Sequence, residues 1–118
     1  MKIRIKGNSV RFRLTQSEVK QLCEEGEVLE KTEFGDSCFY YAVRITQETT
    51  VLSAKYQEQK ITLLLPKSLG KDWYTNAQVG FEQQQDQLFL LLEKDFTCLD
   101  NTMEDQSDNY PNPKLQNT

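Results

Sequence analysis

The sequence predicts one α+β domain: an antiparallel meander of about eight strands, forming a twisted sheet or an open barrel, with two helices. Three observations lead to this fold class: paired segments in which polar and apolar residues alternate, one well-marked helix cap, and a chain of 118 residues. Alternation with a period of two is typical of half-buried strands. A chain of this length also buries a core without disulfides or metal.

The first predicted element is a hairpin at the N-terminus. Residues 2–6 alternate as Lys-Ile-Arg-Ile-Lys, and residues 10–14 alternate as Val-Arg-Phe-Arg-Leu. Between them, Gly7–Asn8 suits a two-residue turn that needs positive φ angles. Pairing Lys6 with Ser9 then sets the register. One face is apolar and expected to be buried, and it consists of Ile3, Ile5, Val10, Phe12 and Leu14.

The next segment has the pattern of a capped helix. Thr15 and Glu18 stand three residues apart, as in a capping box, where each side chain satisfies a backbone N–H at the helix start. Gly26 suits the left-handed conformation that ends many helices. We therefore expect a helix over residues 16–25.

Alternation and turn residues predict three further hairpins. Their strands span residues 28–34 with 39–46, 50–57 with 60–65, and 79–83 with 88–96, and the glutamines at 83–85 form a loop. Between the last two hairpins, Pro66 suits the first turn of a short helix that reaches Trp73. Consecutive hairpins favour a single meander.

The composition changes near the end of the chain. After Phe96 it turns to Asp, Asn, Glu and Gln with two prolines, and the apolar periodicity stops. We therefore expect one domain over residues 1–99 and an acidic C-terminal tail over residues 100–118. The tail carboxylates lack the ligand spacing of a calcium-binding loop.

Composition also disfavours several classes of function. No segment approaches the roughly 20 apolar residues of a membrane span, and three cysteines without CxxC spacing are typical of reduced thiols, so we expect a cytoplasmic protein that does not contact a membrane. A net charge of -4 disfavours binding to nucleic acid. The chain has no histidine and no Gly-rich phosphate loop, so a catalytic role is disfavoured and we expect neither metal nor cofactor.

The second face of the first hairpin is the first candidate binding site. It carries four basic residues, which are Lys2, Arg4, Arg11 and Arg13. The register sets these like charges opposite one another, which is destabilising. The favoured explanation is structural: the acidic C-terminal segment, or carboxylates such as Glu93 and Asp95 on a neighbouring strand, relieve the repulsion. The functional alternative is a ligand with a phosphate or carboxylate group, bound by arginine forks.

Glu30 and Thr32 form a second candidate site. Alternation places both polar side chains on the same face as Val28 and Phe34, and a buried polar group costs free energy unless it is paired. An edge strand, or a register shifted by one residue, would expose this face to water and is the favoured explanation. The functional alternative is a polar cleft in which Glu30 faces Tyr41.

Four segments of the chain resemble a family of short bacterial proteins known as a domain of unknown function. They are MKIRIKGNSVRFRLTQSEV, EKTEFG, LEKDFTCLD and EDQSDNYPNP. The resemblance covers nearly the whole chain and implies a bacterial single-domain protein, without an established activity or catalytic residue. From the residues themselves we expect a non-catalytic binding or accessory protein that acts through a protein partner or a homo-oligomer. The alternative is a small anion-binding protein or enzyme that uses the basic face.

Overall fold

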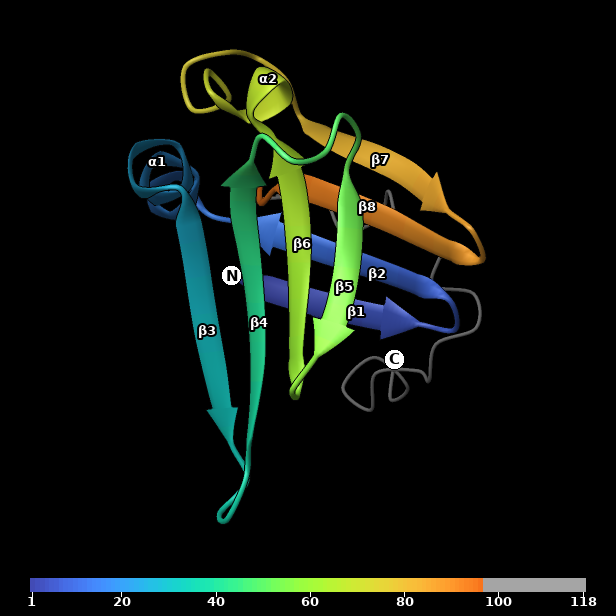
Figure 1. The fold of residues 1–118 in the computed structure, drawn as a ribbon. Coiled ribbons are helices and arrows are strands. Elements are labelled where there is room, and N and C mark those ends of the chain that lie inside the picture. The colour runs from blue at the N-terminus through green and yellow to red at the C-terminus, as the bar shows by residue number, and fades with distance from the viewer. Residues whose placement is uncertain (97–118) are drawn as a thin grey trace, which may run out of the picture.

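The computed structural model describes residues 1–96 and consists of two four-stranded sheets packed face to face (Figure 1). The first sheet has the order β1 (Lys2–Lys6), β2 (Ser9–Leu14), β8 (Leu88–Lys94), β7 (Gly80–Gln85). The second has the order β3 (Glu27–Glu33), β4 (Cys38–Thr46), β6 (Lys60–Pro66), β5 (Ser53–Gln57). Helices α1 (Gln16–Glu25) and α2 (Lys67–Gly70) lie at the end where β4 and β6 finish (Figure 1).

Each sheet joins two antiparallel hairpins through a parallel pair of inner strands. In the first sheet β2 runs parallel to β8, and in the second β4 runs parallel to β6. The predicted single meander is therefore wrong, although all four predicted hairpins are present, and the layers do not close into a barrel. Turn residues specify pairing within a hairpin, whereas pairing between hairpins depends on contacts between distant parts of the chain.

The first hairpin has the predicted register, with Lys6 opposite Ser9. Gly7 has a φ of +54°, which suits a tight turn between paired strands. Phe12 is fully buried, but the predicted burial of Ile5 is wrong, because 56 % of this residue is exposed. Ile5 lies one residue before the end of β1, which among residues 1–96 has a neighbouring strand on one side only.

The helix α1 begins and ends at the predicted residues. The Thr15 hydroxyl accepts a hydrogen bond from the Glu18 backbone N–H, and Glu18 Oε1 accepts one from the Thr15 backbone N–H at 2.8 Å. Gly26 ends the helix with a φ of +86°. Because α1 connects β2 to β3, it carries the chain from the first sheet to the second.

The later elements differ from the prediction in their bounds. The strand β7 continues to Gln85, so the predicted glutamine loop is wrong and the turn lies at residues 86–87. The helix α2 is only four residues long and does not reach Trp73. Gly70 ends it where a Cβ atom would lie 2.7 Å from Leu65 Cδ2, so the helix backbone packs closely against β6.

The core lies between the two sheets. Its largest fully buried side chain is Trp73, whose Nε1 donates to the Gln78 carbonyl oxygen at 2.8 Å and whose ring meets Phe81 edge to face. The fully buried core residues of the strands include Phe12, Leu14, Val43, Leu63, Leu65, Leu90 and Leu92. The predicted domain boundary at residue 99 and the predicted acidic tail lie outside the described residues.

Candidate functional site

The outer face of the first sheet carries the predicted basic site. The registers align its side chains in three rows across β1, β2, β8 and β7. The rows are Lys2, Arg13, Glu93 and Gly80, then Arg4, Arg11, Leu91 and Glu82, and then Lys6, Ser9, Phe89 and Gln84. The basic residues therefore occupy the half of the sheet nearest its β1 edge, and the carboxylates occupy the other half.

Carboxylates at the end of β8 contact three of the basic side chains. Arg11 Nε donates to Glu93 Oε1 at 2.6 Å, and Arg13 Nε lies 3.6 Å from the same oxygen. Lys2 Nζ lies 3.1 Å from Asp95 Oδ2. Glu93 and Asp95 are carboxylates that the sequence suggests as partners of the basic face. Part of the repulsion across β1 and β2 is therefore relieved within the chain.

The basic side chains nevertheless outnumber the carboxylates that contact them. Three of the four cations share two carboxylates, so among residues 1–96 the ion pairs on this face do not balance its four positive charges. In the same part of the chain, Arg4 makes no ion pair, and the Nη atoms of Arg11 and Arg13 donate no hydrogen bond. We name this surface the basic hollow; it measures about 380 Å³ and is lined by Lys2, Ile3, Arg4, Arg11 and Arg13. Guanidinium groups with unused N–H donors are suited to binding carboxylate or phosphate.

The second candidate site brings together two of its three predicted residues. Glu30 lies opposite Tyr41 in the register of β3 and β4, and the Tyr41 hydroxyl donates to Glu30 Oε2 at 2.8 Å. The N-terminal ammonium of Met1 lies 3.5 Å from Glu30 Oε1 and also donates to the Glu18 carboxylate. Thr32 is exposed and makes no side-chain hydrogen bond to the rest of the described chain, so it does not join this network.

The electrostatic environment of this network shifts the pKa of two groups. Burial opposes the charge of Glu18, but hydrogen bonds from the Met1 ammonium and from Thr15 outweigh it and lower the Glu18 pKa. Burial, and then the hydrogen bond to Glu30, raise the pKa of the Tyr41 hydroxyl. Donors from the chain itself thus favour the ionised form of the Glu18 carboxylate. We interpret this network as a structural ion cluster between α1 and the second sheet.

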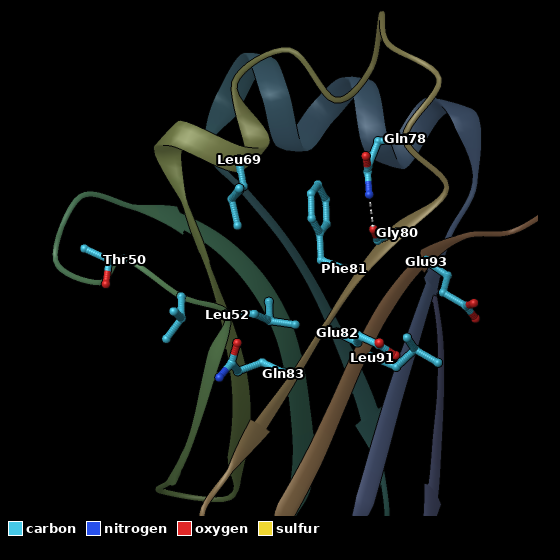
Figure 2. Close-up of a pocket in the computed structure, with 11 residues that line it drawn as sticks. Thr50, Leu52, Leu69, Gln78, Gly80, Phe81, Glu82, Gln83, Leu91 and Glu93 are labelled. Atoms are coloured by element: carbon cyan, nitrogen blue, oxygen red, sulfur yellow. Dashed lines mark hydrogen bonds between the residues drawn. The ribbon is translucent and has the colours of Figure 1, made fainter.

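A hollow of about 490 Å³ along β7 was not predicted from the sequence (Figure 2). Leu69 and Phe81 line it on one side of β7, and Glu82 and Glu93 line it on the other (Figure 2). Its lining comes from separate segments of the chain, so no local motif marks it. Among residues 1–96, no three histidine, cysteine or acidic side chains gather as metal ligands would.

Fold and site together define a class: a small α+β protein of two mixed four-stranded sheets with a partly neutralised basic outer face. The chain belongs to a family of unknown function (DUF7009), whose family model matches residues 1–114. The family membership indicated by the sequence resemblance is therefore confirmed. Neither the curated proteins nor the solved structures contain a match to this chain. Among the described residues, no helix is long and apolar enough to cross a membrane.

Proposed function

We propose that the protein is a non-catalytic binding protein that holds an acidic segment of a protein partner in the basic hollow. The observation that carries this proposal is the excess of cations over carboxylates on the outer face of β1 and β2. An acidic partner would supply the missing counter-charges, and complementary charge increases both association rate and selectivity.

The ion pairs with Glu93 hold the arginine side chains of the site in place before a ligand binds. Glu93 contacts Arg11 and Arg13 at their Nε atoms, so within the described chain it does not occupy the Nη donors. Both arginines are about two-thirds to three-quarters buried, with 27 % and 34 % of their side chains exposed. Side chains held in place before binding lose less conformational entropy when a ligand arrives.

A small anion is a second candidate ligand, and the dimensions of the site favour it. Cations from two adjacent strands surround a hollow of about 380 Å³, which accommodates a phosphate group. Both candidate ligands would bind the same arginines, so an arginine substitution weakens the binding of either one. Only a comparison of the ligands themselves distinguishes the two candidates.

The test compares ligands on the full chain. We expect a fluorescent peptide of alternating glutamate and glycine to bind, and we expect its affinity to fall as salt rises, because exposed charges are screened over about 8 to 10 Å. Arg4→Ala with Arg11→Ala should weaken binding by at least about tenfold. Arg13 still contacts Glu93 in this double variant, so that carboxylate keeps a partner.

The control removes the same number of charges elsewhere. Lys20→Ala with Lys67→Ala alters two exposed lysines on α1 and α2 and should leave binding unchanged. Equal loss in both double variants, or no binding of the acidic peptide by the intact protein, would contradict the proposal. If millimolar phosphate raises the melting temperature of the intact protein while the peptide does not bind, the small-anion candidate is the correct one.

A further inference from the structure

The strand β1 presents a row of backbone groups that pair with no residue of the described chain. It is the edge strand of the first sheet, next to β2 only. Because Lys6 and Ser9 flank the two-residue turn, they form a hydrogen-bonded pair. Along β1, the backbone N–H and C=O groups of successive residues then point alternately toward β2 and away from it. The backbone N–H and C=O groups of Ile3 and Ile5 point away from β2, so they lie at the edge of the sheet.

The inner side of the same edge is apolar. Ile5 and Val10 of the first sheet and Phe39 and Tyr56 of the second line a hollow of about 500 Å³, which continues to Gln85 and Leu88 at the turn between β7 and β8. In Figure 1, the strands β3 and β4 extend beyond β1, so the second sheet is longer than the first at this edge. Tyr56 is 65 % exposed and Ile5 is 56 % exposed, which shows that the strands of the first sheet leave this apolar surface uncovered.

The two sides of β1 therefore offer opposite chemistry to a neighbouring strand. The basic hollow lies on the outer face, and the apolar hollow lies on the inner face. Successive side chains of a strand point to opposite faces of a sheet. A strand placed beside β1 would direct every second side chain toward Arg4 and the residues between toward Ile5.

We infer that the partner binds as an added strand on the β1 edge, through an extended segment in which acidic and apolar residues alternate. This inference rests on the proposed function and specifies its partner. Backbone hydrogen bonds to Ile3 and Ile5 supply affinity, as in other proteins that add a strand to a sheet edge. The acidic side chains meet Arg4 on the outer face, and the apolar side chains cover Ile5 and Tyr56.

A second copy of this chain is a poor occupant of the same edge. Two β1 strands side by side would bring Lys2, Arg4 and Lys6 of one copy close to the same residues of the other. Like charges across paired strands are destabilising, and lysine on an edge strand is a common protection against self-pairing. An acidic partner removes this repulsion, whereas a second copy increases it.

The experiment uses two peptides of the same composition with the full chain. In the first peptide glutamate and valine alternate, and in the second the glutamates come first and the valines follow. We expect the alternating peptide to bind at least about tenfold more tightly. N-methylation of its backbone at alternate amides should abolish that advantage, because it removes N–H donors while it leaves the charges in place. Binding should also protect the amide hydrogens of Ile3 and Ile5 from exchange.

A matched pair of protein variants tests the edge itself. Ile5→Pro and Ile5→Ala both remove the isoleucine side chain, but only proline removes the N–H that points away from β2. Proline is tolerated on edge strands at such positions. We expect Ile5→Pro to lose the preference for the alternating peptide and Ile5→Ala to keep most of it. If Ile5→Pro does not fold, the N-methylated peptide still decides the question.

The outcomes separate the two proposals. If both peptides bind equally, the strand addition is wrong while the proposed function stands. If neither peptide binds, both are wrong. If the alternating peptide binds more tightly but Ile3 and Ile5 gain no protection, its preference arises elsewhere and the inference is wrong.

Discussion

The side-chain amide of Gln85 forms two hydrogen bonds with the backbone of Ala54. Its Oε1 accepts from the Ala54 N–H at 2.8 Å, and its Nε2 donates to the Ala54 carbonyl oxygen at 3.0 Å. Gln85 ends β7 and Ala54 lies in β5, so this contact joins the edge strands of the two sheets. The glutamine amide occupies the place that a paired strand would otherwise take.

Gln85→Ala should therefore lower the free energy of unfolding by about 1 to 3 kcal/mol, because it leaves partly buried backbone groups without partners. Urea unfolding measures the loss. Gln85→Glu should also be destabilising at neutral pH, since a carboxylate accepts from the Ala54 N–H but cannot donate to its carbonyl oxygen. The exposed neighbour Gln84 is the control, and Gln84→Ala should change stability by no more than about 0.5 kcal/mol. Similar losses at both positions would show that the two hydrogen bonds to Ala54 add no specific stability.

The turn between β5 and β6 offers a stabilising substitution. Glu58 and Gln59 both have positive φ angles, 51° and 63°, although neither is glycine. This left-handed conformation costs a side chain roughly 1 to 2 kcal/mol per residue, and Asn-Gly is the preferred sequence for such a hairpin turn. Glu58→Asn with Gln59→Gly should raise the melting temperature, as measured by calorimetry. The same pair of changes at the exposed helix positions Glu24→Asn and Glu25→Gly should lower it. A lower melting temperature for the turn variant would contradict the turn geometry.

The lowered pKa of Glu18 predicts a specific dependence of stability on pH. A carboxylate whose pKa is lower in the folded than in the unfolded state adds stability above the unfolded value. This contribution is lost as the pH falls below about 4.3 and through the folded pKa. Glu18→Gln should therefore reduce the loss of stability on acidification, as measured by urea unfolding at several pH values. A glutamine at this position still fits a capping box, so the helix start is largely retained.

The control for this prediction is Glu24→Gln on the exposed side of the same helix. It should leave the acid limb of the stability curve as it is in the intact protein. If Glu18→Gln and the intact protein lose stability in parallel on acidification, the ion cluster of Glu18 with the Met1 ammonium does not contribute to folding.

The part of the candidate site that depends only on the pairing of β1 with β2 was predictable from the sequence. The pairing of Lys6 with Ser9 follows from the turn, and it places Arg4 opposite Arg11 without any knowledge of the rest of the fold. The sequence allows Glu93 as one of several carboxylates that could relieve the basic face, but it does not predict the particular contact with Arg11, since this contact joins residues that are distant in the chain. The sequence does not predict the apolar hollow beside Ile5. Alternation indicates that every apolar residue on one face of a strand is buried, so it cannot distinguish Ile5 from the buried residues of that face.

The sequence by itself determined the hairpins, the first helix and the basic face, because turn residues, capping residues and alternation act over a few neighbouring positions. Only the tertiary structure decided that β2 runs beside β8 and β4 beside β6. The local patterns are compatible with several pairings between hairpins, and the packing of residues distant in the chain stabilises one of them. The same holds for Gln84 and Gln85, which are identical in type and adjacent in the chain. The pleat of β7 turns one toward solvent and the other toward Ala54, so only packing against the second sheet gives Gln85 its role.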